Sequence, residues 1–162
     1  MSDSEVHHDH SVDRAYDYYD CDPAVLAEED IGRLLSQDAA DAGFTVLGVP
    51  QFHRFAGGGF SQILLFAESH GAIHGSPEKG HCLEVTIHSC YVLGLSDKQK
   101  TPDEKAADLH RLWSARLRPE RIVTYPERRR ATRGSRDFHH LYEEAEAVIP
   151  MQGRRARKQA RG

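Results

Sequence analysis

Three short runs of apolar and β-branched residues follow one another in the middle of the chain, and they constrain the fold more than any other feature. The runs read FTVLGV, FSQILLFA and GHCLEVTIHSCYVLG and lie within residues 44–94. Their composition suits strands, and a glycine-rich turn at Gly57–Gly59 between the first two predicts an antiparallel pair. In the third run, strand periodicity puts Leu83, Val85 and Ile87 on one face and Cys82, Glu84, Thr86, His88 and Cys90 on the other.

Two helical segments flank these strands. Asp22 is a typical N-cap followed by a proline, and Gly43 is a typical stop, so one helix is expected to run through AVLAEEDIGRLLSQDAADA. The second segment, TPDEKAADLHRLWSARL, begins with Thr101 and Glu104 at the spacing of a capping box. The expected apolar stripes are Leu26, Ile31, Leu34, Leu35, Ala39 and Ala42 in the first helix and Leu109, Leu112, Trp113 and Leu117 in the second.

The order of elements predicts the fold class. With a strand before the first helix and a last strand at RIVTY, the order is strand, helix, strand, strand, strand, helix, strand. This order favours an α+β fold, an antiparallel sheet with two helices on one face in a two-layer sandwich. The other face of the sheet needs a cover. A second copy of the sheet would supply it, so a homodimer with a four-layer αββα arrangement is expected.

Charge is distributed unevenly along the chain of 162 residues, which by length forms one domain. Residues 1–31 hold ten acids and a single base, Arg14, whereas ten of the 21 Lys and Arg lie after Glu127. We therefore expect an acidic, disordered N-terminus at 1–13, a folded domain at 14–126 and a basic C-terminal extension at 127–162. Without aromatic interleaving or a helix-turn-helix pattern, the basic extension does not predict nucleic-acid binding.

Compartment and redox state follow from two absences in the sequence. No apolar run reaches the roughly 18 residues that a membrane span needs, and the N-terminus lacks the basic and then apolar pattern of a leader. Cys21, Cys82 and Cys90 are an odd number without a disulfide framework. A cytoplasmic protein with free thiols and no membrane partner is expected.

Residue types that can take part in catalysis or bind a metal lie close together in LLFAESHGAIHGSPEKG. An apolar run there ends in Glu68, Ser69 and His70, and His74 follows. One interpretation is a zinc site of His70, His74, His88 and Cys90, although the spacing matches no usual pair of ligand loops; the HHDH at residues 7–10 is a weaker metal motif. Another is a hydrolytic serine, Ser69, with His70 or His74 as base, although the G-x-S-x-G elbow is missing. In a third, these are ordinary polar residues at a strand end.

A wider pattern resembles the prokaryotic S-adenosylmethionine decarboxylase family, from about YDCDPAVL through RIVTYPERRR. The matching pieces are FHRF at 52–55, Ser61 eight residues before Ser69, AESH, the histidine of AIH, PE at 77–78 and VTIHSC ending in Cys90. Members of this family cut themselves at a Glu-Ser bond and convert the serine into a pyruvoyl group. The resemblance therefore implies a proenzyme that cleaves between Glu68 and Ser69 and carries a pyruvoyl cofactor made from Ser69.

The resemblance also implies roles for individual residues. Ser69 Oγ would attack the Glu68 carbonyl, Ser61 would hydrogen-bond the developing oxyanion, and His74 would take the Cα proton of Ser69. Cys90 resembles the acid that protonates the decarboxylated substrate, because a thiol of ordinary pKa ~8.5 is protonated near neutrality. The expected small-molecule substrate is S-adenosylmethionine, decarboxylated for polyamine (spermidine) biosynthesis, and no metal is required.

Departures from the family pattern concern the substrate. Phe55 and Glu78 match positions that resemble an adenine-stacking aromatic and a ribose-hydroxyl acceptor, but Ser76 stands where the family usually carries a tryptophan. Arginine or ornithine is therefore an alternative substrate, with Glu78 and Glu84 available for its cationic end. A noncatalytic homologue that regulates an active partner is a further alternative.

Overall fold

The structure, a computed structural model, describes residues 10–75, 82–90 and 100–131. Seven strands form one antiparallel sheet in the order β2-β3-β4-β5-β1-β6, with β7 also pairing with β1. The elements in chain order are β1 (His10–Tyr19), α1 (Pro23–Leu26), α2 (Ile31–Ala42), β2 (Val46–Arg54), β3 (Phe60–Phe66), β4 (Ser69–Gly75), β5 (Leu83–Cys90), α3 (Pro102–Leu117), β6 (Arg121–Thr124) and β7 (Arg128–Ala131).

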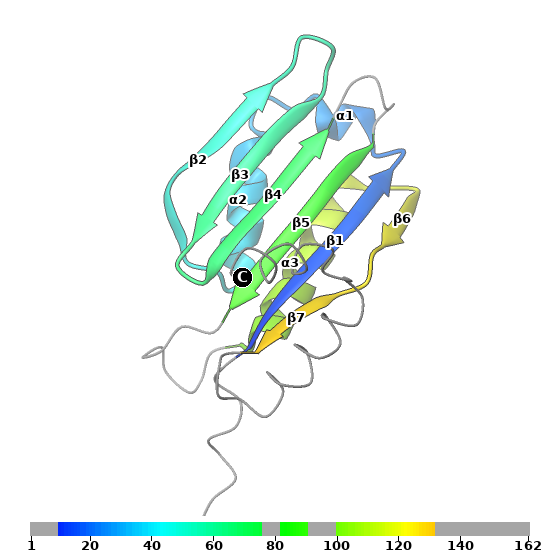
Figure 1. The fold of residues 1–162 in the computed structure, drawn as a ribbon. Coiled ribbons are helices and arrows are strands. Elements are labelled where there is room, and N and C mark those ends of the chain that lie inside the picture. The colour runs from blue at the N-terminus through cyan, green and yellow to red at the C-terminus, as the bar shows by residue number, and fades with distance from the viewer. Residues whose placement is uncertain (1–9, 76–81, 91–99, 132–162) are drawn as a thin grey trace, which may run out of the picture.

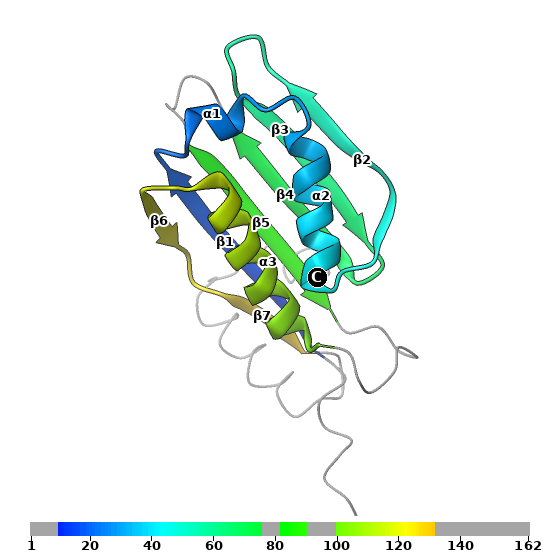
Figure 2. The same cartoon turned by 180° about the vertical axis from the view of Figure 1, so that it is seen from behind.

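The helices lie on one face of the sheet, as Figures 1 and 2 show from its two sides, and this confirms the predicted two-layer α+β class. The core between the layers contains Trp113, Leu109 and Leu117 of α3 and Ile31 and Leu35 of α2, all fully buried. Strand periodicity is as predicted on β5, where Leu83, Val85 and Ile87 face this core. No helix among the described residues is long and apolar enough to cross a membrane.

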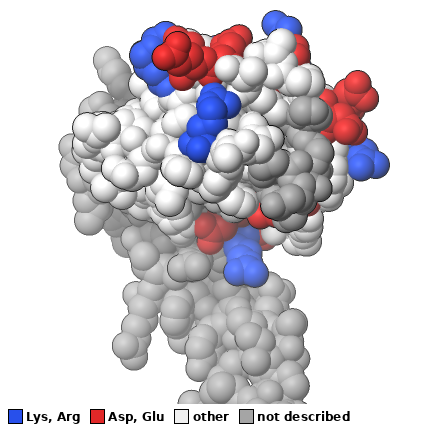
Figure 3. Space-filling model, turned by 90° about the horizontal axis from the view of Figure 1, so that it is seen from above, with Lys and Arg blue, Asp and Glu red and all other residues white. Residues whose placement is uncertain are grey.

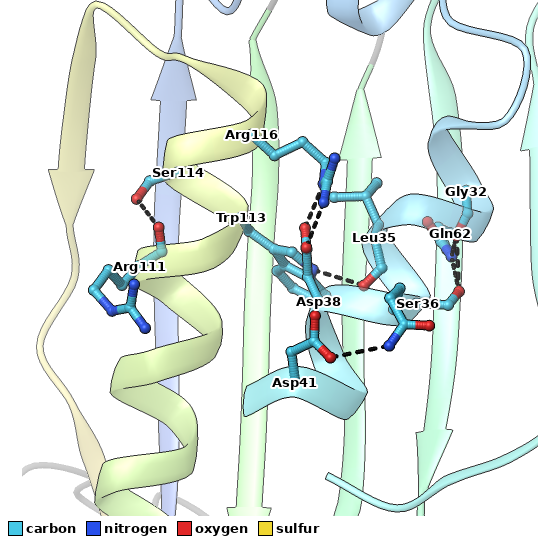
Figure 4. A network of polar contacts seen from close by, with 11 residues as sticks. Gly32, Leu35, Ser36, Asp38, Asp41, Gln62, Arg111, Trp113, Ser114 and Arg116 are labelled. Atoms are coloured by element: carbon cyan, nitrogen blue, oxygen red, sulfur yellow. Dashed lines mark hydrogen bonds and ion pairs between the residues drawn. The ribbon is translucent and has the colours of Figure 1, made fainter. Parts of the chain in front are cut away.

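Polar contacts tie the two long helices to each other and to the sheet (Figure 4). The indole of Trp113 donates to the Leu35 carbonyl at 3.0 Å, and Arg116 of α3 forms a bidentate ion pair with Asp38 of α2. From β3, the buried Gln62 amide donates to the Gly32 carbonyl at 2.7 Å. These bonds cross the helix layer and hold α2 and α3 at fixed positions over the central strands.

The helix ends follow the predicted capping with one correction. Thr101 and Glu104 form the expected capping box, and Gly43 ends α2 with a φ of +102°. The single helix expected from residue 24 to 42 is wrong, since α1 ends at Leu26 and α2 begins at Ile31. Arg54 satisfies carbonyls at the break, because its guanidinium donates to the Leu26 and Glu28 carbonyls, both at 2.8 Å.

The strand count is a second correction. The predicted order omitted β4 as a separate strand and did not include β7. The chain does not leave the sheet at Glu68; it reverses through the Ala67–Glu68 turn and pairs back along β3 from Ser69 to His74. β1 and β7 pair with each other at residues 10–13 and 128–131, so the sheet extends beyond residues 14 and 126, the limits expected for the folded domain.

The face of the sheet opposite the helices is partly apolar, whereas the end of the molecule that holds α1 carries charged side chains. The face of the sheet opposite the helices carries exposed apolar side chains, among them Ile63 and Leu65 at 56% and 58% exposure. Viewed from the end that holds α1 and the β2–β3 turn, acidic and basic side chains are interspersed (Figure 3). Within the described part of the chain, the face opposite the helices, called the open face below, is therefore the surface that would gain from a cover.

Candidate active site

The predicted cleavage bond lies at the tight turn between β3 and β4. Ser69 begins β4 and is the register partner of Phe66 on β3 and Ser89 on β5. Its φ is +151°, a backbone conformation that residues with a side chain rarely adopt and that costs on the order of 1–3 kcal/mol. The peptide between Glu68 and Ser69 is therefore followed by a strained residue that the surrounding sheet holds in place.

The Glu68 carbonyl receives two donors from a single residue. The backbone N–H of Cys90 donates to the Glu68 carbonyl oxygen at 3.0 Å, and the Cys90 thiol lies 2.5 Å from the same oxygen. A carbonyl held this way is polarised, and negative charge that develops on its oxygen during attack at the carbonyl carbon is stabilised. Sequence reasoning gave this function to Ser61 and did not predict that Cys90 contacts the Glu68 carbonyl.

Glu68 is buried, with 1% of its surface exposed, and both oxygens of its carboxylate accept hydrogen bonds. Lys105 Nζ lies 2.8 Å from one carboxylate oxygen, and Thr45 donates through its backbone N–H at 3.0 Å and its hydroxyl at 3.2 Å. Burial alone would raise the pKa of Glu68, but the hydrogen bonds and the charge of Lys105 outweigh it and lower the pKa below its usual range. The carboxylate is therefore ionised at neutral pH.

Cys90 is a protonated thiol at neutral pH. Its partial burial and the nearby charge of Glu68 raise the pKa of the thiol above its usual value, while Lys105 acts in the opposite direction. The sulfur is half-buried at the open face of β5. A protonated and accessible thiol next to Ser69 can donate a proton.

Ser61 and His74 form a second group at the other end of β4. They lie opposite each other on β3 and β4, and Ser61 Oγ is 2.5 Å from His74 Nδ1. Phe55 packs edge-on against the His74 ring at 5.9 Å, and Glu84 is the register partner of His74 on β5. The resemblance assigned Ser61 and His74 to the Glu68–Ser69 bond, whereas within one copy they contact each other at the far end of β4.

His74 follows Ser69 by five residues on the same strand. At ~3.3 Å per residue, roughly 16 Å separate the two along β4. Ser61 lies equally far from the cleavage bond, because it pairs with His74. Within one copy of the chain, the structure brings together Glu68, Ser69 and Cys90 and, separately, Ser61, His74 and Phe55.

Two further histidines lie beside Ser69 on the open face. His70 Nδ1 is 3.2 Å from Ser69 Oγ, its ring stacks on that of His88 at 5.3 Å, and His88 contacts Asp13. They line a groove of about 730 Å³ that extends to Tyr125. No three His, Cys, Asp or Glu side chains in the described ranges are placed to hold a metal ion, so the four residues of the zinc hypothesis do not converge.

Some of the predicted residues lie outside the described ranges, and some residues of the site were not predicted. Ser76 and Glu78 lie outside the described residues, as do His7 and His8 of the HHDH motif. Sequence reasoning missed Lys105 and Thr45, although Lys105 shares a helix face with Leu109 and Trp113, and a lysine in an apolar stripe is a recognisable sign of a buried partner. It also missed Ser89, whose buried hydroxyl finds no hydrogen-bond partner within the described part of the chain.

Comparison with known proteins gives a consistent result. A family model described as S-adenosylmethionine decarboxylase matches residues 14–130. The S-adenosylmethionine decarboxylase proenzyme of Pyrococcus furiosus is 32% identical over 88 residues, 54% of this chain and 58% of that protein. The proenzyme of Acetivibrio thermocellus is 37% identical over 73 residues, 44% of this chain and 57% of that protein. The matched part thus spans a little more than half the length of these relatives.

The fold also has a counterpart among solved structures. The crystal structure of the adenosylmethionine decarboxylase from Aquifex aeolicus superposes with a TM-score of 0.57 and covers 76% of this chain and 91% of that chain. At 24% sequence identity, this similarity concerns the fold.

Proposed function

The chain belongs to the S-adenosylmethionine decarboxylase family, and we propose that it is a proenzyme that cuts itself between Glu68 and Ser69 and then decarboxylates S-adenosylmethionine. Its product would enter polyamine synthesis such as that of spermidine. The pyruvoyl group made from Ser69 would supply a carbonyl that binds the substrate amine and withdraws electrons from the bond to the leaving carboxylate. Cys21, Cys82 and Cys90 are not joined in a disulfide, which supports a cytoplasmic location.

The observation that carries the proposal is the geometry of the Glu68–Ser69 peptide. A strained serine follows a carbonyl that already accepts two hydrogen bonds from Cys90. Attack of Ser69 Oγ on the Glu68 carbonyl carbon would form an ester as the peptide C–N bond breaks. The Cys90 N–H would stabilise the oxyanion, and the strain at Ser69 would be released.

The remaining steps need a base and water. His74 would remove the Cα proton of Ser69, so that the bond from Cβ to the ester oxygen breaks and Glu68 leaves with a free carboxylate. Residue 69 is then a dehydroalanine, and addition of water with loss of ammonia leaves a carbonyl on Cα. Because the resemblance assigns this base to His74, and not to His70, whose Nδ1 lies 3.2 Å from Ser69 Oγ, the proposed cleavage requires His74 within reach of Ser69.

A second copy of the chain would bring that histidine. Because roughly 16 Å of strand separates His74 from Ser69 within one copy, the two cannot act on the same bond there. A homodimer that packs the open sheet faces together would cover Ile63 and Leu65 and could lay the Ser61–His74 pair of one protomer against Ser69 of its partner. The packing argument and the chemical argument both favour the same dimer.

The surroundings of Ser69 fit a pyruvoyl group. Ser89, the register partner of Ser69 on β5, has a buried hydroxyl with no partner in the described residues, and a carbonyl at position 69 would offer an acceptor next to it. Cys90 follows Ser89 and holds a proton beside the same position. The cluster thus contains a hydrogen-bond donor and an acid for a carbonyl cofactor.

Arginine or ornithine remains a second candidate substrate because of acids on the open face. Asp17 and Glu84 are register partners on β1 and β5, and Glu84 also lies opposite His74. Paired carboxylates next to the catalytic histidine suit a guanidinium or ammonium group. Release of carbon dioxide from a panel of S-adenosylmethionine, arginine and ornithine would identify the substrate.

The first test is the intact mass of the purified protein under denaturing conditions, with a Ser69→Ala variant as control. We expect two fragments, residues 1–68 and a pyruvoyl-capped 69–162, and a single uncut chain for the variant. A wild-type chain that stays uncut over days would reject the proposed enzyme in favour of a noncatalytic, regulatory homologue.

A further inference from the structure

The Glu68 side chain is held by donors that the cleavage chemistry does not use. Lys105 and Thr45 provide three hydrogen bonds to its carboxylate, while the two donors from Cys90 act on its carbonyl. Lys105 is itself 4% exposed and reaches Glu68 from α3, 37 residues further along the chain. A buried lysine paired with the residue before the cleavage bond is a specific arrangement, because lysine is almost never fully buried without a partner.

The Lys105–Glu68 ion pair lies close to the carbonyl where negative charge would develop during cleavage. Attack on the Glu68 carbonyl creates an oxyanion a few bonds away from the ionised carboxylate of the same residue. In a buried site, two negative charges so close oppose each other strongly. The charges of Glu68 and Lys105 also shift the pKa of the Cys90 thiol in opposite directions, and this thiol touches the carbonyl oxygen. Lys105 therefore offsets the Glu68 charge at the place where the oxyanion forms.

We propose that Lys105 is a positioning residue for self-cleavage, which holds the Glu68 carboxylate together with Thr45 and thereby keeps the Glu68 carbonyl against Cys90. The pair anchors one side of the turn, and the sheet register of Ser69 anchors the other. The peptide between them cannot relax away from the two Cys90 donors while both anchors hold. This inference rests on the proposed self-cleavage and assigns a residue of α3 to it.

The test compares cleavage rates of chains made by cell-free synthesis and followed by intact mass. Lys105→Met should slow cleavage by about 10²-fold, since the carbonyl loses its fixed position and an uncompensated charge faces the oxyanion. Lys105→Arg, which keeps the charge, should recover most of the rate. The matched control is Lys100→Met, because Lys100 pairs with Asp108 near the same end of α3 and makes no contact with Glu68 among its described bonds.

Two measurements separate positioning from a general loss of structure. Lys105→Met should slow the Glu68→Gln chain much less than the wild-type chain, because the neutral amide needs no counter-charge. In the His74→Ala background, where the ester would persist because elimination lacks its base, hydroxylamine should release fragments readily when Lys105 is present and slowly with Lys105→Met, because the ester would form slowly. Equal slowing in both backgrounds, or equal hydroxylamine cleavage, would overturn the proposal.

The result also distinguishes this inference from the proposed function. A wild-type chain that cuts while Lys105→Met cuts equally fast rejects the function of Lys105 and leaves the enzyme intact. A wild-type chain that does not cut at all rejects self-cleavage, and with it the positioning function.

Discussion

Cys90 combines two properties that a single residue of the site has to satisfy. Its backbone N–H and thiol both donate to the Glu68 carbonyl oxygen, so in the uncut chain the residue can stabilise the oxyanion of self-cleavage. The raised pKa of its thiol keeps the proton in place at neutral pH, so the same residue can act as an acid on a substrate. The sequence resemblance predicted the second property. It could not predict the first, because the contact depends on how β5 lies against the β3–β4 turn.

The Cys90 thiol is expected to react slowly with iodoacetamide. Because the thiolate is the nucleophile and the pKa is raised, the labelling midpoint should lie above ~8.5, the value of a free cysteine. The measurement is peptide mass spectrometry on the uncut Ser69→Ala chain over a pH series. The buried Cys21, with a pKa raised to about 12 mainly by burial, is the internal control and should stay unlabelled. A midpoint at or below that of a free cysteine peptide would contradict the assignment.

At the scale of elements, local patterns were predictable and distant contacts were not. The capping box of α3, the end of α2 at Gly43 and the two faces of β5 follow from neighbours in sequence, and all three are confirmed. At the break between α1 and α2, two carbonyls accept hydrogen bonds from Arg54, 26 to 28 residues away, a contact that local patterns do not reveal. Likewise, Lys105 finds Glu68 only after the helix packs on the sheet. The separation of Ser69 from His74 was not predicted either, because the resemblance placed both at one bond; it follows from their spacing of five residues along β4 once that strand is known.

The contact between α2 and α3 is expected to depend on Asp38. Its carboxylate is 5% exposed and accepts two charge-assisted bonds from Arg116, at 2.5 and 2.6 Å. Asp38→Ala should lower the free energy of unfolding by about 2 kcal/mol, because both bonds are lost while Arg116 can turn toward water. Chemical denaturation of the uncut Ser69→Ala chain measures the change.

Asp41→Ala provides the matched control on the same helix. Asp41 is exposed and accepts one bond from Gln37 at 2.9 Å, so its loss should cost no more than about 0.5 kcal/mol. Equal effects of the two substitutions would show that the Asp38–Arg116 pair contributes nothing beyond a surface contact.

At the scale of the whole molecule, the proposed dimer predicts complementation between inactive chains. His74→Ala retains Ser69, and Ser69→Ala retains His74, so each should stay uncut when made alone. When the two are co-expressed, a mixed dimer should contain one complete site and convert the His74→Ala chain into two fragments. Intact mass distinguishes the two chains, and sedimentation verifies the dimer. Cleavage of His74→Ala alone, or none in a verified mixed dimer, would contradict the composite site.

The turn that would be cut joins two strands that stay hydrogen-bonded to each other on either side of it. Residues 1–68 supply β1, β2 and β3, and the rest of the chain supplies β4 to β7. In the sheet, β1 lies between β5 and β6 and also pairs with β7, so four strand pairings, β3–β4, β1–β5, β1–β6 and β1–β7, join the two pieces. After cleavage, a protomer would thus consist of two polypeptides whose strands are interleaved in one sheet. Its unfolding midpoint should rise with protein concentration, and refolding from denaturant should require the pieces to find each other again.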